Sequence, residues 1–137
     1  MKARVRPEKE IFLLYGLEEE TEKGKKLREL LSTMGIKTVT VTDAMLSETV
    51  EFCAGLPGST ASGAPYGGES LPYEMMVMQI TRPRLNEVLT ALHKGGLLVE
   101  RKAVITPTNR KWSFQHLYEQ VCEEHEWMTA KAKPGQN

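Results

Sequence analysis

The segment from Thr106 to Ser113 gathers the residue types that are best suited to bind an anion. Asn109 can donate its side-chain amide, Arg110 can hold a carboxylate or phosphate through two parallel hydrogen bonds, and Lys111 adds a point charge. Ser113 stands where the next helix is expected to begin, and the free N–H groups at that end of a helix favour negative charge. The segment is therefore predicted to bind a small carboxylate or phosphate through Asn109, Arg110, Lys111 and Ser113.

The same segment also fits a turn that binds nothing. Pro107 stiffens the chain, Trp112 can pack on the following helix, and Ser113 can cap that helix. Capping chemistry explains most of these residue types without a ligand. Arg110 and Lys111 are the two residues that a turn does not require, so the anion site depends mainly on them.

Histidine and cysteine side chains on the last expected helix raise the question of a metal site. His116 and His125 lie about 180° apart on a helix that turns 100° per residue, so they cannot share an ion. Cys122 and His125 can face each other, but two ligands are too few for structural zinc. We therefore predict no metal site.

Motifs for nucleophilic or nucleotide chemistry are not found in the sequence. Three serines, Ser59, Ser62 and Ser70, lie in a glycine-rich stretch without the strand-to-helix elbow of a serine nucleophile. The run from Gly58 to Gly63 lacks the Lys-Ser/Thr of a phosphate loop, and no G-x-G-x-x-G occurs. No catalytic residue and no cofactor are predicted.

The elements that position these residues follow one plan twice. Each half has an apolar run of strand length, then a helix with one apolar stripe, then a second strand. In the first half these are residues 11–15, the stripe Leu27, Leu30, Leu31 and Met34, and the alternating run 38–42; in the second they are residues 74–78, the stripe Leu85, Val88, Leu89 and Leu92, and residues 102–106. We predict two pseudo-repeats, 10–54 and 74–128, each a β-α-β unit.

Two such units favour an α+β fold, a four-stranded ferredoxin-like sheet with an additional C-terminal helix over about 113–128. The runs at 11–15 and 75–78 are apolar throughout, as central strands would be, whereas 38–42 alternates like an edge strand. Two helices are expected on one face of the sheet and the third helix on the other. The connection of roughly thirty residues between the units is long for a hairpin, so a small doubly wound α/β parallel sheet is the alternative.

One domain is expected over residues 1–130, because 137 residues is an ordinary length for a single core. Between the repeats, residues 55–72 are rich in Gly, Ser, Pro and Ala and are predicted to form a mobile linker. Residues 131–137 are predicted to be a disordered tail.

Charge and composition exclude several classes of partner. Lys and Arg number 18 and so do Asp and Glu, which gives a formal net charge of +0 and no electrostatic match for nucleic acid or an anionic membrane. The apolar run behind the basic N-terminus is too short for a signal sequence or a membrane span. Two widely separated cysteines suit a reducing compartment, so a cytoplasmic protein is expected.

The second half resembles a small bacterial family, the domain of unknown function 3783. The resemblance rests on Glu74-Met75-Met76-Val77, on Leu85 and Leu92, and above all on Lys102-Ala103-Val104-Ile105-Thr106, Asn109-Arg110-Lys111-Trp112 and Glu123-Glu124-His125-Glu126. It implies a bacterial, cytoplasmic α/β or α+β domain and supplies no activity, ligand or catalytic residue.

These observations favour a non-enzymatic binding or protein-interaction module. It would pair with a protein partner or with itself through the edge strand 38–42 or the last helix, because an open strand edge offers unpaired backbone groups. The alternative is a ligand sensor or small enzyme that uses Asn109, Arg110 and Lys111 as an anion clamp, with His116 as an acid or base. An Arg110→Ala variant separates the two.

Overall fold

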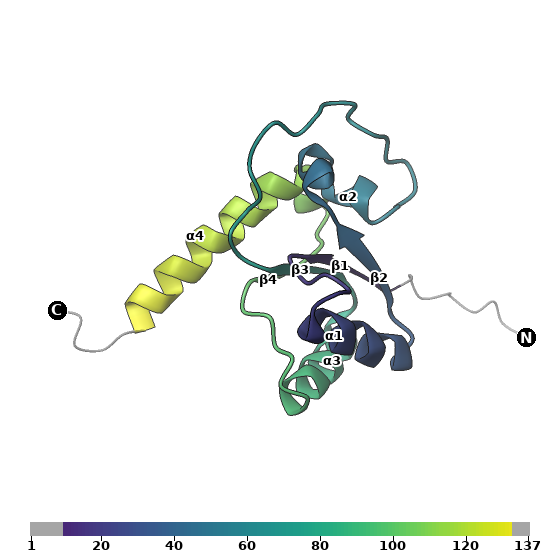
Figure 1. Cartoon of the computed structure of the whole chain (residues 1–137), viewed down its shortest axis with the longest axis vertical. Coiled ribbons are helices and arrows are strands. Elements are labelled where there is room, and N and C mark those ends of the chain that lie inside the picture. Colours follow the sequence, from purple (N-terminus) through teal and green to yellow (C-terminus); the bar gives the residue numbers. More distant parts are fainter. Residues whose placement is uncertain (1–9, 133–137) are drawn as a thin grey trace, which may run out of the picture.

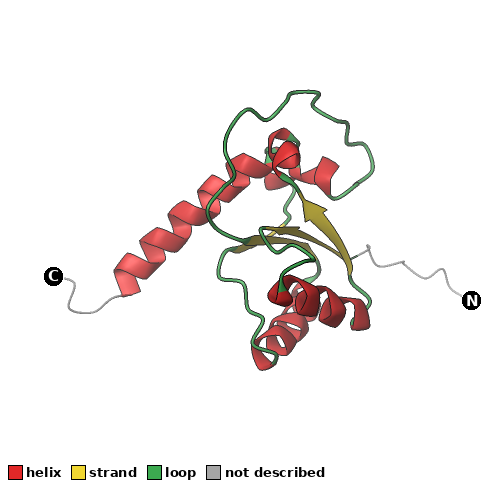
Figure 2. Ribbon diagram, viewed as in Figure 1, coloured by secondary structure: helices red, strands yellow, loops and turns green. Residues whose placement is uncertain are grey.

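The computed structural model describes residues 10–132, which form one mixed sheet with helices on both faces (Figures 1 and 2). In chain order the elements are β1 (Ile11–Tyr15), α1 (Glu22–Thr33), β2 (Lys37–Val41), the 3₁₀ helix η1 (Asp43–Ser47), α2 (Val50–Cys53), β3 (Met75–Gln79), α3 (Arg82–Lys94), β4 (Lys102–Val104), the 3₁₀ helix η2 (Asn109–Lys111) and α4 (Phe114–Ala132). The prediction of an α+β fold with a four-stranded sheet and a C-terminal helix is confirmed.

The strand order corrects the predicted topology. The sheet runs β2-β1-β3-β4, with β1 parallel to β2, β3 parallel to β4, and β1 antiparallel to β3. A ferredoxin-like sheet would separate the two strands of each unit, so that prediction is wrong in its strand order. The fully parallel alternative is wrong as well, because the two central strands run in opposite directions.

The strand order was wrongly predicted because an apolar pattern indicates that a strand is buried but does not identify its neighbours. Both first strands are indeed central, and residues 37–41 do form an edge. Both central strands, however, are buried on both faces, so hydrophobicity does not say which of them the edge strand should join. In this structure the helix of each unit brings the second strand of that unit beside its first, so β2 pairs with β1 and β4 pairs with β3.

Two apolar layers cover the sheet. On one face, Phe12 and Leu14 of β1 pack with Leu27 of α1 and Leu92 of α3. On the other face, Leu13 of β1 packs with residues of η1, α2 and α4, among them Leu46, Val50 and Phe114. Figure 1 shows α1 and α3 below the sheet and α2 and α4 above it. Two helices thus share one face and the last helix lies on the other, as predicted.

Two contacts between the halves each join residues that lie 64 apart in the sequence. Leu13 pairs with Val77 at the centre of the β1–β3 ladder. Thr49 and Ser113, also 64 apart, form an isolated antiparallel bridge before α2 and α4. Around it the backbone N–H groups of Val50 and Phe114 donate to the carbonyls of Trp112 and Glu48, a nearly symmetric pair of bonds. The two halves are therefore related by an internal approximate two-fold axis.

The two halves differ most in their last helices. The first ends in the four-residue α2, whereas α4 has 19 residues, and its C-terminal part projects from the body (Figure 1). It continues to Ala132, two residues into the segment predicted as a tail; residues 133–137 and 1–9 lie outside the described residues. Within the described range, no helix has the length and apolar character needed to cross a bilayer.

Replacing Phe12, whose side chain is fully buried between β1 and the α1–α3 layer, tests this packing. We expect Phe12→Ala to lower the free energy of unfolding by about 3–5 kcal/mol, because it removes a large ring and leaves a cavity. Leu98→Ala, at an exposed site, is the control and should stay within about 0.5 kcal/mol. Equal losses in urea denaturation would contradict the packing.

Candidate functional site

Asn109, the first of the predicted ligand-binding residues, is buried and holds its own loop together. Its side-chain oxygen accepts a hydrogen bond from the Thr106 N–H at 2.9 Å, and its amide nitrogen donates to the Val104 carbonyl at 3.1 Å. Its backbone N–H donates to the Thr106 hydroxyl at 3.0 Å. Asn109 thus fixes the exit from β4.

Arg110 and Lys111 already face a carboxylate of the protein itself. Arg110 Nε lies 2.8 Å from Glu51 Oε1, and Lys111 Nζ lies 3.4 Å from Glu51 Oε2. Glu51 belongs to α2 and is buried. The hydrogen bond from Arg110, reinforced by the Lys111 charge, lowers the pKa of the Glu51 carboxyl below its usual value. An added anion would therefore compete with Glu51.

Ser113 caps α4, because its hydroxyl accepts a hydrogen bond from the His116 N–H at 3.1 Å. It also forms the bridge to Thr49 described above. The four predicted residues therefore lie together, and in this structure they join the end of β4 to α2 and α4. Binding of a carboxylate or phosphate there stays a prediction.

A separate pocket of about 550 Å³ lies at the carboxyl ends of β1 and β2. Three segments form it: the residues that end β1, the residues that end β2, and the last residues before β3. Its lining consists of Tyr15, Gly16, Glu18, Thr40, Val41, Thr42, Asp43, Ser70, Leu71, Pro72, Tyr73 and Glu74. A volume in the range of about 300–1,000 Å³ is typical of small-molecule sites.

The path of the chain creates this pocket. After β1 the chain crosses to α1 on one face of the sheet, whereas after β2 it enters η1 and α2 on the other face. Adjacent parallel strands whose connections leave to opposite faces open a crevice at their carboxyl ends, and such crevices are the usual ligand sites of open α/β sheets.

Asp43, an exposed residue of the lining, is held in place by hydrogen bonds. Tyr15 donates its hydroxyl hydrogen to Asp43 Oδ1 over 2.6 Å, and the Ser70 hydroxyl donates to Asp43 Oδ2. The Leu71 N–H in turn donates to the Tyr15 oxygen at 2.8 Å. The hydrogen bonds from Ser70 and then Tyr15 lower the pKa of the Asp43 carboxyl, while burial raises the pKa of the Tyr15 phenol. Asp43 is therefore an oriented carboxylate at neutral pH.

The walls of the pocket are fixed by two basic residues of α1. Lys23 Nζ lies 2.5 Å from Glu74 Oε2 and also donates to the Leu98 carbonyl at 2.9 Å. Arg28 donates to the carbonyl of Leu17 in the loop after β1 and to the Thr40 hydroxyl, so it ties that loop to β2. These contacts preorganise the pocket before any ligand arrives.

Gly16 begins the loop after β1 and is required for two reasons. Its φ of 77° lies in the left-handed region, and a Cβ atom placed there would come within 3.1 Å of the Glu74 Cα atom. The turn into the pocket and the close approach of β3 therefore both depend on glycine at this position.

Sequence reasoning missed this pocket. Ser70, Leu71 and Pro72 belong to the segment predicted as a mobile linker, yet Ser70 and Leu71 form hydrogen bonds with Asp43 and Tyr15. The available signal was the polar pair Thr42-Asp43 directly after an edge strand. It could not be used without the strand order, which brings β1 and β2 side by side.

The histidines and cysteines considered as metal-binding candidates have separate surroundings in the described part of the chain. The His116 ring packs edge-on against Trp112 with 4.7 Å between centroids, and His125 lies near Glu100. Burial raises the pKa of the Cys53 thiol to about 12. Among residues 10–132, no three His, Cys, Asp or Glu side chains are grouped in a way that could hold a metal ion.

Comparison with known proteins identifies one family. Residues 74–128 match the family model of the Domain of unknown function (DUF3783), and the resemblance of the second half to this family is confirmed. The match spans β3 to α4, which is one of the two related halves, and includes the Asn109–Ser113 segment. Of the pocket residues it contains Glu74 alone. No curated protein and no solved structure matches the chain.

The structural role of Asn109 can be tested directly. We expect Asn109→Ala to lower the free energy of unfolding by about 1–3 kcal/mol, because the Thr106 N–H and the Val104 carbonyl lose their partner. Asn86→Ala, at an exposed position of α3, serves as the control and should have little effect. Unchanged stability of Asn109→Ala in urea denaturation would argue against this role.

Proposed function

We propose that the protein is a non-enzymatic binding module of the bacterial cytoplasm and that its ligand is a small molecule held in the pocket at the carboxyl ends of β1 and β2. The observation that carries this proposal is the crevice itself, where the connections of two adjacent parallel strands diverge to opposite faces. The oriented Asp43 and the fixed walls support it, because a site ordered in advance loses less entropy on binding.

A binding role fits this site better than catalysis. Asp43 carries a full charge and its pKa is lowered, whereas a general acid or base working near neutral pH needs a pKa close to that pH. The phenol of Tyr15, whose pKa is raised, is engaged with both Asp43 and Leu71. These groups suit recognition of a ligand rather than proton transfer.

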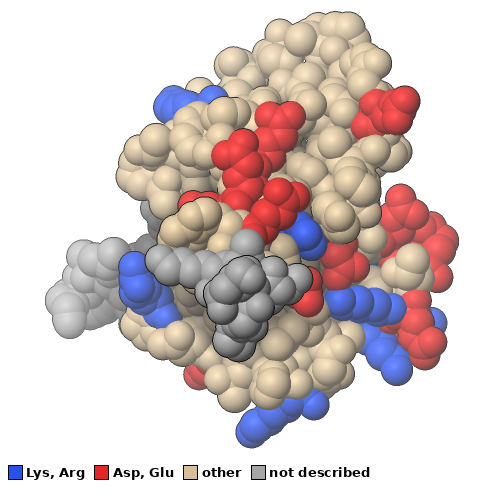
Figure 3. All heavy atoms as spheres, turned by 90° about the vertical axis from the view of Figure 1, so that its left-hand side faces the viewer, with Lys and Arg blue, Asp and Glu red and all other residues tan. Residues whose placement is uncertain are grey.

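A protein partner is the second candidate, and α4 supports it. Trp127 and Met128 are each 60% exposed on the part of α4 that projects from the body. The helix bears Glu119, Glu123, Glu124 and Glu126 without Lys or Arg before residue 131, and Figure 3 shows Asp and Glu side chains gathered on the face toward which it points. Two copies of such a helix would repel each other, so charge favours a basic partner over a homodimer.

A thermal-shift screen with two tryptophan variants tests the pocket. Pro72 is exposed and lines the pocket, whereas Pro57 is exposed in the same connecting segment and does not. A ligand present at 100 times its dissociation constant should stabilise the wild-type chain by about 2.7 kcal/mol. We expect Pro72→Trp to abolish that stabilisation, because the indole occupies the pocket, and Pro57→Trp to keep it.

Three outcomes would contradict the proposal. The first is a ligand unaffected by Pro72→Trp but lost in Arg110→Ala, which would favour the anion site at Asn109–Ser113 instead. The second is a screen without any ligand. The third is a mass that rises with protein concentration in sedimentation while Pro72→Trp leaves every ligand of the screen unaffected, which would favour self-association.

A further inference from the structure

We propose that the pocket selects a cation, namely a primary amine carried on a small apolar or aromatic body, and that Glu18 and Asp43 receive its ammonium group. This inference rests on the proposed function, since it assigns a ligand class to the same pocket. It follows from the charges that line the pocket, from the groups that neutralise them, and from the corresponding positions in the other half of the chain.

The lining of the pocket is acidic. Glu18, Asp43 and Glu74 contribute carboxylates, and no Lys or Arg belongs to the lining. Lys23 neutralises Glu74 at 2.5 Å. Glu18 has no ion-pair partner and Asp43 has only the neutral donors Tyr15 and Ser70 among residues 10–132, so two negative charges remain unbalanced.

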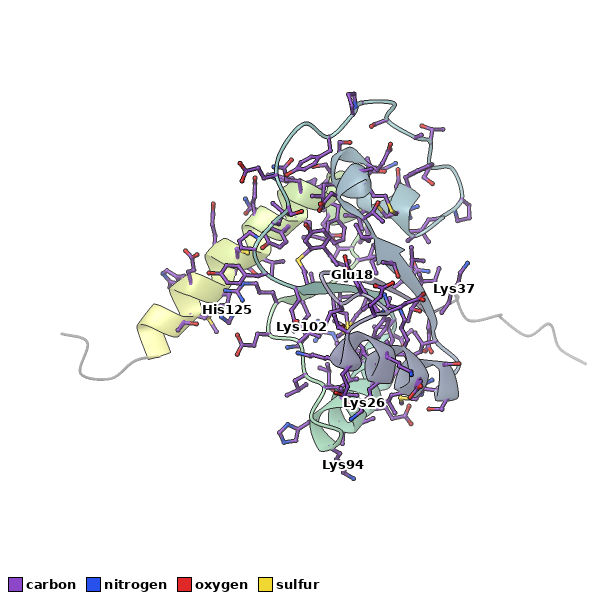
Figure 4. The ribbon with its side chains drawn as sticks, viewed as in Figure 1. Glu18, Lys26, Lys37, Lys94, Lys102 and His125 are labelled. Carbon is purple, nitrogen blue, oxygen red and sulfur yellow. The ribbon has the colours of Figure 1, made fainter. Side chains whose placement is uncertain are left out.

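Two nearby basic residues do not belong to the lining, and each contacts a lining residue, Arg28 at Thr40 and Arg101 at Tyr73. Arg28 lies 4.0 Å from Glu19 and donates to Leu17 and Thr40, and Arg101 stacks over the Tyr73 ring with 3.8 Å to its centroid. Lys37, at the opposite end of β2, lies away from Glu18 at the edge of the view in Figure 4. Among residues 10–132, Glu18 and Asp43 are therefore the two acids of the lining that pair with no basic side chain.

The fold itself does not require these two acids. At the spacing of 64 residues that relates the first strands, Asp43 corresponds to Pro107. Glu18 lies in the six residues between β1 and α1, whereas only two residues separate β3 from α3. The second half builds the same strand, helix and strand without either carboxylate. The acids are thus a property of this pocket and not of the β-α-β unit.

The remaining lining suggests what carries the ammonium group. Leu71, Pro72 and Tyr73 present apolar or aromatic surface beside the two carboxylates. An ammonium group donates three hydrogen bonds and suits carboxylate acceptors, and an attached ring or alkyl chain would bury its surface against these residues. A partly exposed internal example is already present, because Lys23 places its own ammonium on Glu74 and a backbone carbonyl.

Three matched probes test the assignment on the full-length chain: benzylamine, benzyl alcohol and benzoate, followed by ¹H–¹⁵N NMR titration. We expect benzylamine to shift the amides of Gly16 and Asp43 saturably and to bind at least about tenfold more tightly than the other two probes. Its affinity should fall as NaCl is raised, whereas that of benzyl alcohol should not.

Charge-neutral variants assign the contact to named residues. Asp43→Asn should weaken benzylamine about tenfold or more, as expected for a hydrogen bond to an oriented charge. Glu18→Gln, at an exposed position, should weaken it about two- to fivefold. Glu29→Gln, an exposed acid of α1 outside the pocket, is the control and should leave the affinity unchanged.

The results separate this inference from the function on which it rests. Benzyl alcohol or benzoate binding in the pocket as tightly as benzylamine, with sensitivity to Pro72→Trp, would overturn the amine assignment and keep the proposed function. Benzylamine binding unchanged in both Asp43→Asn and Glu18→Gln would also overturn it. No pocket shift with any probe, together with no ligand in the screen that Pro72→Trp abolishes, would overturn both.

Discussion

The antiparallel pairing of β1 with β3 is the interaction on which the rest of the structure depends. It joins two β-α-β units that each have their own parallel pair of strands, and it buries five consecutive residues of β1 on both faces of the sheet. Because the central strands run in opposite directions, the carboxyl ends of the two parallel pairs lie at opposite ends of the sheet. Each half thereby has its own strand-end region, and the two regions have become chemically different.

At the first of these ends the acidic pocket forms, and at the second the chain enters the Asn109–Ser113 segment. In the first region Asp43 is held by Tyr15 and Ser70 and faces the pocket. In the second, Arg110 and Lys111 close on Glu51 of the first half. A chain of two similar halves thus has an open pocket at one strand end and a contact between its halves at the other.

The sequence predicts the elements well because their patterns are local. The apolar stripes of α1 and α3, the apolar central strands and the alternating edge strand all follow from spacing alone. The strand order did not follow, since β1 and β3 are both buried on both faces and each is an equally good neighbour for 37–41. The choice between them is made by tertiary packing.

Local sequence patterns likewise predict only part of the candidate site. Asn109, Arg110, Lys111 and Ser113 were found from residue type, and the structure does bring them together. Their partner Glu51 lies 59 residues before Arg110, in a helix of four residues, and no local pattern links them. The pocket was missed because its three walls come from separate segments, of which 70–74 was interpreted as part of or next to a linker.

Interstrand nuclear Overhauser effects on the full chain test the central claim, the pairing of β1 with β3, most directly. We expect antiparallel contacts in the register that opposes Leu13 to Val77, together with contacts between Thr49 and Ser113 and parallel contacts from β1 to β2. Contacts that place β4 beside β1, as in a ferredoxin-like sheet, would contradict it. They would also remove the strand ends that form the pocket.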